Sequence, residues 1–176
     1  MKLVRWKRFT WDLSKLPAAE ATLPSHFTVR PAGREDAKLT REVILTSFSL
    51  DAGWSDVLKI FKGKLEAQLD AAFARPPQHI VVITHGQRII AASLMTVDPD
   101  AENHLLSGPC VFSEYRCRGL GSHLLYESLK YLKGAGLSKA LGISKETSAA
   151  SKFVYRKFGS AGAPYDYDPD LAASAR

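Results

Sequence analysis

Residues 113–132 read SEYRCRGLGSHLLYESLKYL, which places two arginines and two glycines directly before an amphipathic helical pattern. Because glycine has no Cβ atom, the backbone at Gly119 and Gly121 can take unusual dihedrals and let another molecule approach its N–H groups. The helix that follows directs its unpaired N–H groups and the positive end of its dipole at the same place. This stretch therefore predicts an anion-binding site, and phosphate is the anion it suits best.

The two arginines of this stretch indicate which kind of anion the site would bind. Arg116 and Arg118 add positive charge and paired donors, which suit a pyrophosphate better than a single carboxylate. On spacing alone, a basic loop before an ordinary surface helix explains the stretch equally well, because short glycine motifs give many chance matches.

Composition indicates one globular domain with an anionic partner. The chain has 176 residues, of which 45% are hydrophobic, enough to bury a sizeable core. A formal net charge of +6 favours a nucleotide cofactor, a nucleic acid or a membrane surface as partner. The only dense basic patch is MKLVRWKRF at residues 1–9, which makes nucleic acid a weak expectation.

The cysteines and the apolar runs bear on the cellular setting. Cys110 and Cys117 are too few for a disulfide framework and lack metal-ligand spacing, so we expect a reducing compartment and no metal. Basic residues interrupt the first apolar run before it reaches signal-peptide length, and no run is long enough to span a membrane. A cytoplasmic protein without membrane contact is the expectation.

Hydrophobic periodicity divides the rest of the chain into strands and helices. Two β-branched runs separated by HGQ are typical of a hairpin with glycine in the turn. The order strand, two helices, three-stranded meander, helix, strand, helix indicates a mixed α/β sheet rather than a uniform βαβ alternation. The expected strands cover residues 27–32, 79–84, 88–98, 104–112 and 138–144, and the expected helices lie within residues 33–48, 55–74, 121–133 and 148–159.

Two motifs in this order resemble a known family. VFSEYRCRGLGSHLL follows a predicted strand, opens a helix and resembles the acetyl-CoA-binding signature R/Q-x-x-G-x-G/A of the GNAT superfamily of N-acetyltransferases, with Arg116, Gly119 and Gly121 in the matching places. Downstream, KFVYRKFG resembles the family's helix with a tyrosine before a closing glycine, filled here by Tyr155 and Gly159. Two correctly spaced motifs are more specific than either alone.

The resemblance covers roughly residues 27–160 and implies a fold. We expect a single GNAT-like α/β domain at residues 27–165, with a mixed, mostly antiparallel central sheet flanked by about four helices. Residues 1–26 would form an N-terminal arm and residues 166–176 a C-terminal tail.

The chain departs from the family's pattern at its ends and at two motif positions. Ser113 stands where proline is common, and Ser148 stands where asparagine is common, so Ser148 can cap a helix but reaches less far toward a cofactor. Little chain remains after Gly159 for the family's two closing strands. We therefore hypothesise that LVRWKRFTW, at residues 3–11, lies on the sheet and takes over part of that role, with a disordered arm as the alternative.

The resemblance also implies a reaction and its parts. The protein would move an acetyl group from acetyl-CoA, the cosubstrate, to a primary amine by direct attack in a ternary complex. In the family, the backbone of the strand before the signature pairs with the pantetheine arm, and Pro109 has no N–H, so the donors to the thioester would come from Cys110 or Val111. The expected cofactor contacts are Cys110, Val111, Arg116, Cys117, Arg118, Gly119, Leu120, Gly121, Ser122 and Ser148.

The general acid of this reaction is assigned from the motif, whereas the general base is assigned only from the position and chemistry of its side chain. Tyr155 is the candidate general acid, which would protonate the sulfur of coenzyme A as it departs. His104 ranks first as general base because it titrates near neutrality, ahead of Asp98, Asp100 and Glu102 or a chain of water molecules.

Other functions and partners stay open. Cys117 at a helix N-terminus could serve a thioester hydrolase with His123 as its base, although that spacing puts the two on different helix faces. A non-catalytic acyl-CoA sensor and a nucleic-acid-associated module are further alternatives. The acceptor would be a small molecule or peptide with an amine, drawn by acids in residues 96–104 or by Asp166, Asp168 and Asp170, and a homodimer is left open.

Overall fold

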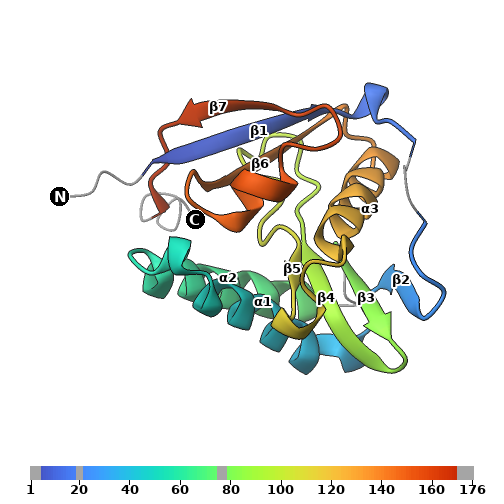
Figure 1. Cartoon of the computed structure of the whole chain (residues 1–176). Helices are drawn as coiled ribbons and strands as arrows, with labels where there is room; N and C mark the ends of the chain where they lie inside the picture. Colours follow the sequence, from blue (N-terminus) through green and yellow to red (C-terminus); the bar gives the residue numbers. More distant parts are fainter. Residues whose placement is uncertain (1–4, 19–21, 75–78, 170–176) are drawn as a thin grey trace.

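Two antiparallel sheets, held at an angle to each other, form the framework of the computed structural model, which describes residues 5–18, 22–74 and 79–169 (Figure 1). The first sheet has the order β2-β3-β4-β5 and the second has the order β6-β1-β7. The strands are β1 (Trp6–Asp12), β2 (Phe27–Pro31), β3 (Ile80–His85), β4 (Arg88–Leu94), β5 (Cys110–Val111), β6 (Lys139–Lys145) and β7 (Ala161–Tyr165).

Three α-helices and one short π-helix cover the sheets. They are α1 (Ala37–Leu50), α2 (Leu58–Phe73), α3 (Leu120–Gly134) and the π-helix Ala150–Val154. α1 and α2 lie on one face of the first sheet and α3 lies on the other (Figure 1). The predicted class, a mixed α/β fold with antiparallel strands and about four helices, is confirmed.

The first sheet separates two apolar cores. Alternate side chains of a strand point to opposite faces, so Ile80 and Val82 of β3 pack with α1 and α2, while Val81 and Ile83 pack with α3. A strand with apolar residues on both faces has to be covered on both sides, and the continuous run IVVIT in the sequence reflects this.

The N-terminal strand is the central strand of the second sheet. β1 pairs antiparallel with β6 and with β7, so Phe9 lies opposite both Gly142 and Gly162. Large side chains on β1 face small residues on its neighbours, and an added Cβ at Gly162 would lie 2.9 Å from the Phe9 ring. The hypothesis that residues 3–11 lie on the sheet is confirmed from residue 6 onward, and residues 3 and 4 lie outside the described residues.

The proposed boundaries of arm, domain and tail stay predictions. Residues 1–4 of the basic start and residues 170–176 of the tail lie outside the described residues. Within the described ranges, no helix combines the length and the apolar character needed to cross a membrane.

β5 is much shorter than the strand predicted over residues 104–112, and that prediction was wrong in extent. Gly108 takes the left-handed conformation with φ of 61°, and Pro109 after it cannot donate to a ladder. Pairing with β4 is therefore confined to Cys110 and Val111. The helix expected over residues 148–159 is likewise reduced to the π-helix Ala150–Val154.

The two sheets separate between β5 and β6, which form no ladder with each other in the described part of the chain. A segment at residues 103–107 joins them at one end. His104 N–H donates to Leu141 O of β6 at 2.7 Å, and Ser107 N–H donates to Leu94 O of β4 at 3.2 Å. The other end of the gap stays open, and a cavity lies there.

Trp11 offers a test of how far the protein depends on β1. Its side chain is fully buried, and its indole N–H donates to Lys157 O at 2.9 Å. We expect Trp11→Ala to lower the free energy of unfolding by about 3–5 kcal/mol, because it removes a large buried ring. Chemical denaturation followed by circular dichroism measures this loss. Thr10→Ala, one position along the strand and half-buried, should cost less than about 1 kcal/mol, and equal losses would contradict the assigned role of Trp11.

Candidate active site

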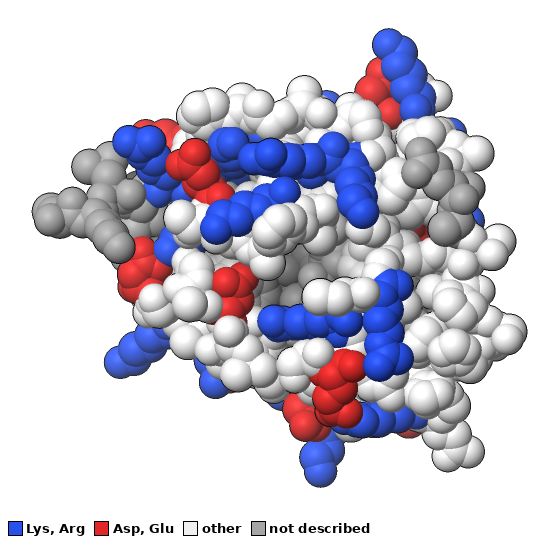
Figure 2. All heavy atoms as spheres, viewed as in Figure 1, with Lys and Arg blue, Asp and Glu red and all other residues white. Residues whose placement is uncertain are grey.

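A cavity of about 490 Å³ opens where β5 and β6 separate. Figure 2 shows a hollow on this face of the molecule, with lysine and arginine side chains on both of its sides. Its walls come from the end of α1, the start of α2, β5, the start of α3, β6 and the π-helix. Segments distant in sequence therefore meet at one space, which is the arrangement expected of a binding site.

The start of α3 presents unpaired amides to this cavity. Gly119 precedes the helix with φ of 75°, and the first bond inside the helix runs from His123 N–H to Gly119 O at 3.0 Å. The N–H groups of Leu120, Gly121 and Ser122 come before this bond, so they have no partner within the helix. All four residues from 119 to 122 line the cavity, as an anion site at this helix end requires.

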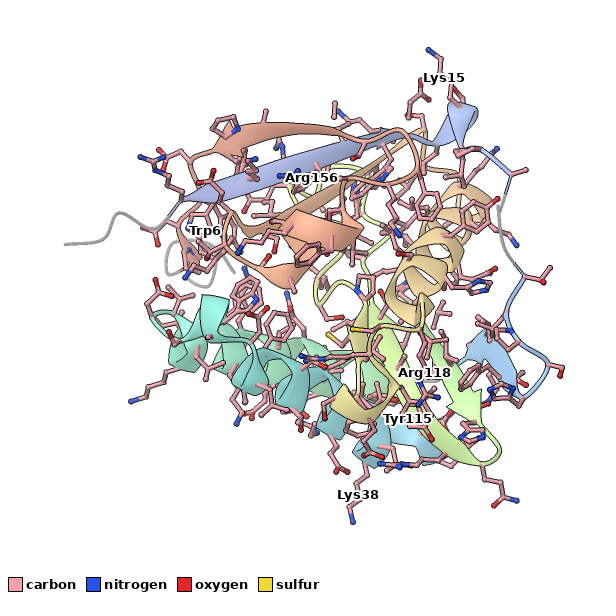
Figure 3. All side chains as sticks on the ribbon, viewed as in Figure 1. Trp6, Lys15, Lys38, Tyr115, Arg118 and Arg156 are labelled. Atoms are coloured by element: carbon pink, nitrogen blue, oxygen red, sulfur yellow. The ribbon has the colours of Figure 1, made fainter. Side chains whose placement is uncertain are left out.

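Of the two arginines in the signature, Arg116 lines the cavity and Arg118 does not. Arg118 donates from Nη2 to Glu114 O at 3.4 Å and lies 5.3 Å from the ring centre of Tyr115. Figure 3 shows Arg118 near the start of α3 and Arg156 beside the second sheet, and Figure 2 shows basic side chains on both sides of the hollow. Positive charge thus stands both inside the cavity and along its rim.

Val111 carries the free backbone amide of β5. In an antiparallel ladder, residues alternate between bonding to the neighbour strand and pointing away from it. Phe112 N–H donates to Ile90 O at 2.9 Å, so Cys110, two residues earlier, also bonds to β4, opposite Ala92. Val111 between them directs its N–H and C=O away from β4, into the gap where β6 does not pair.

Tyr155 reaches the same cavity from the π-helix. Its N–H donates to Ala150 O at 2.8 Å, the five-residue bond of a π-helix, a feature frequent at functional sites. The ring stands edge-on to Phe9 and to Trp11, each with ring centres 5.5 Å away. Burial, followed by the neighbouring Cys110, raises the pKa of the Tyr155 phenol, so this hydroxyl keeps its proton.

The Tyr155 hydroxyl lies against the backbone just before β5. A Cβ atom added to Gly108 would be 2.1 Å from the Tyr155 oxygen, and Gly108 also has φ of 61°. Only glycine allows both this backbone conformation and this close approach. Gly108 therefore sets the position of the phenol relative to β5.

Comparison with known proteins agrees with this geometry. A model of the acetyltransferase (GNAT) family matches residues 48–160, which include the free amides of α3 and Tyr155. The chain belongs to the acetyltransferase (GNAT) family. Membership supports acyl transfer as the general activity of the domain. Among curated proteins, no match to the sequence was found.

Solved structures with the GNAT fold resemble the chain at low sequence identity. A GCN5-related N-acetyltransferase from Sphaerobacter thermophilus is 16% identical with a TM-score of 0.63, over 92% of this chain and 49% of that one. A GNAT-family acetyltransferase from Colwellia psychrerythraea is 16% identical with a TM-score of 0.61, over 92% and 53%. The chain thus spans about half the length of these structures, and at such identities the likeness shows the fold alone.

His104 does not bring a free nitrogen to the GNAT cavity. It is buried outside the lining, where Nδ1 accepts from Leu141 N–H at 3.0 Å and Nε2–H donates to Asp98 O at 2.9 Å. Burial lowers the pKa of this imidazole. The ring is a neutral clamp between β6 and the preceding turn, so the structure gives no support to the predicted role as general base.

Of three further residues predicted to contact the cofactor, Cys110 and Cys117 line the cavity and Ser148 does not. Ser148 caps the π-helix by accepting from Ser151 N–H at 3.1 Å, but its buried hydroxyl also pairs with Ser144 at 2.7 Å and does not line the cavity. Cys110 and Cys117 both line the cavity. Burial raises the pKa of the Cys110 thiol to about 12, which makes it an inert wall residue, whereas Cys117 is exposed.

The acids expected to attract an amine lie elsewhere. Asp98, Asp100 and Glu102 are outside the cavity lining, and Glu102 accepts from the Tyr165 hydroxyl at 2.7 Å. Of the tail acids, Asp170 lies outside the described residues. No group of three metal-binding side chains is present within the described ranges.

Sequence reasoning missed the wall contributed by α1, α2 and the turn between them. Phe48 and Phe61 fall within the helices expected from the sequence, and nothing in the sequence singled out Asp51 or Trp54. The only available signal was the break DAGW at residues 51–54, where the helical pattern stops at an acid before a glycine. The lining residues from this part of the chain are Ser47, Phe48, Asp51, Trp54 and Phe61.

The buried state of His104 predicts a pH dependence of stability. Its pKa is lowered in the folded protein, so below about pH 6.5 the unfolded chain binds more protons there and the folded state loses stability as the pH falls. The loss from this one group is at most about 1.4 kcal/mol per pH unit. We expect His104→Gln to flatten the fall between about pH 7 and pH 5, as measured by urea denaturation at several pH values.

The matched control for this test is His26→Gln, which removes an exposed histidine. It should leave the pH dependence of stability close to that of the natural chain. A steep fall that persists unchanged in His104→Gln would contradict the neutral clamp.

Proposed function

We propose that the protein is an N-acetyltransferase that moves the acetyl group of acetyl-CoA to a primary amine by direct attack in a ternary complex. The observation that carries the proposal is the convergence of three features on one cavity. These are the free amides at the start of α3, the outward amide of Val111 and the protonated hydroxyl of Tyr155.

The start of α3 suits the diphosphate of the cosubstrate. Three unpaired amides and the positive end of the helix dipole favour a phosphate at this place, and Arg116 adds a full charge beside them. Gly121 leaves room there, because an added Cβ would already meet Val111 at 3.9 Å and Val154 at 3.8 Å. The diphosphate is therefore held mainly by backbone donors, which need no side-chain reorganisation.

The amide of Val111 suits the thioester carbonyl. As the amine attacks, negative charge builds on that oxygen, and a fixed N–H donor aimed at it stabilises the transition state more than the ground state. The separation of β5 from β6 leaves this donor unpaired. The Ser47 hydroxyl donates its one proton mainly to Val43 O at 2.8 Å and lies 3.4 Å from Val111 O.

Tyr155 suits the departing sulfur. Its hydroxyl lies beside the backbone that leads into β5, close to where the thioester would sit. The raised pKa keeps the phenol protonated, so it can donate a hydrogen bond to the sulfur as the carbon–sulfur bond breaks. A free thiol has a pKa of about 8.5, far below the raised pKa of the Tyr155 phenol, so the phenol does not give up its proton to the thiolate. The ammonium formed on the acceptor nitrogen is the easier source of that proton.

Two alternatives are less well supported by the geometry. A thioester hydrolase would need a base beside Cys117, but His123 lies on α3 with its Nε2 atom 3.8 Å from Glu127 Oε1. A non-catalytic sensor would need only the anion site, and it leaves the close fit of Tyr155 against Gly108 without a purpose. Binding of acetyl-CoA without release of coenzyme A across a panel of amines would favour the sensor.

Gly121→Val tests the anion site. The added side chain enters the space between β5 and the π-helix and crowds the cavity at the diphosphate, so acetyl-CoA affinity measured by calorimetry should fall at least about 10-fold. Gly134→Val at the far end of α3 is the matched control, because a Cβ there meets nothing within 4 Å. Equal affinities in the two variants would count against the site.

Tyr155→Phe tests the leaving step. Removing the hydroxyl should lower kcat by about 10- to 100-fold and leave the affinity for acetyl-CoA nearly unchanged, because the phenol acts only as the sulfur departs. Gly108→Ala should lower kcat as well, since its methyl group displaces the same hydroxyl. Release of coenzyme A measured with a thiol reagent gives kcat, and unchanged turnover in both variants would show that the Tyr155 hydroxyl does not assist departure of the sulfur.

A further inference from the structure

We infer that the acceptor is a primary amine with one positive charge and an apolar, ring-sized body, and that Asp51 binds its ammonium group. This inference rests on the proposed function and names the class of substrate for the same cavity. It is carried by the wall that α1, α2 and the turn between them contribute to the cavity.

The wall is built from aromatic side chains. Ring centres of Phe48 and Trp54 are 4.9 Å apart, those of Phe48 and Phe61 are 5.2 Å apart, and those of Trp54 and Phe61 are 4.5 Å apart. All three rings line the cavity. Aromatic walls favour apolar bodies and also attract a nearby cation through their ring faces.

Asp51 supplies the charge that an ammonium needs. Among the described residues that line the cavity, it is the only one with a carboxylate side chain. Its Oδ1 accepts from Gly53 N–H at 2.9 Å and its Oδ2 accepts from Ala149 N–H at 3.4 Å, so the turn after α1 and the start of the π-helix hold it in place. An ionised carboxylate has about four acceptor positions, which leaves capacity for a ligand. The bound ammonium releases one proton to solvent in the open cavity before its nitrogen attacks the thioester carbon, and the nitrogen passes a second proton to the sulfur as the carbon–sulfur bond breaks.

The neighbouring acid is already paired. Asp56 forms an ion pair with Lys145, whose side chain is 7% exposed. Arg116 and Lys157 are the cations in the lining. A lining with one carboxylate and two cations suits an acceptor with a single positive charge and disfavours a polyamine, since a second ammonium would find no second carboxylate and would meet like charge.

The hydroxyl groups of Ser47 and Ser144, near this wall, already have hydrogen-bond partners within the protein. Ser47 donates to Val43 O at 2.8 Å, and Ser144 pairs with Ser148 at 2.7 Å. An acceptor with several hydroxyl groups would lose its bonds to water and find few partners in return. An amino sugar is therefore a poor match, whereas an arylalkylamine matches both the rings and the single carboxylate.

The first experiment compares acceptors with the unmodified full chain. Release of coenzyme A from acetyl-CoA is measured with 2-phenylethylamine, 1,4-diaminobutane and glucosamine. We expect kcat/KM for 2-phenylethylamine to exceed that for either other amine by about 100-fold, because only this amine satisfies the aromatic wall without an unpaired charge or hydroxyl. A preference for the diamine or the amino sugar would overturn the inference and leave the proposed transferase standing.

The second experiment removes the charge of Asp51. Asp51→Asn keeps the shape of the side chain and an oxygen for the Gly53 amide. It should raise KM for 2-phenylethylamine by about 10- to 100-fold, which corresponds to the free energy of a hydrogen bond to a charged group. The KM for acetyl-CoA should not change. The control Glu42→Gln removes an acid from the exposed side of α1 and should change neither value.

Calorimetry separates the two ways in which these experiments can fail. If acetyl-CoA binds and an amine is acetylated but Asp51→Asn leaves KM for 2-phenylethylamine within twofold, the assignment of Asp51 is overturned alone. If acetyl-CoA gives no heat with the natural chain, the proposed function fails first and the inference falls with it. Thermal unfolding of Asp51→Asn and Glu42→Gln shows whether a change in KM reflects lost folding.

Discussion

The missing hydrogen bonds between β5 and β6 are the constraint on which the rest of the molecule depends. Two strand edges that end in the interior need partners, and residues 103–107 supply them at one end only. His104 and Asn103 accept the amides of Leu141 and Ile143, as a neighbouring strand would. At the other end the edges stay free, so the amide of Val111 and the cavity exist because pairing stops there.

Local signals were sufficient for much of the fold. The β3–β4 hairpin, α1, α2 and α3 follow from the spacing of their apolar residues and from glycines at their ends, and the structure has them close to the expected bounds. The length of β5 was not available from residues 104–112, because the segment reads as strand-forming until Gly108 turns it away. Its real partners are in β6 and β4, and no local pattern records which backbone groups a distant strand will use.

The candidate site likewise has a part that could be predicted from the sequence and a part that could not. The anion end could be predicted because Gly119 and Gly121 act locally, through the start of the helix they belong to. His104 could not be judged from its sequence neighbours, since its two nitrogens are occupied by groups from β6 and from the turn before it. Asp51 gave no signal of its own, because its place in the cavity depends on a hydrogen bond from Ala149 N–H, which is 98 residues away in the sequence.

The position of β1 also bears on how the protein is made. Trp11 and Lys157 are hydrogen-bonded across 146 residues of sequence, and the strand partners of β1 among the described residues are β6 and β7. During synthesis the ribosome releases β1 before any element it pairs with, whereas β2 to β5 and three helices follow as a contiguous block able to form its own contacts. Completion of the second sheet, and with it the environment of Tyr155, must await synthesis of β6 and β7.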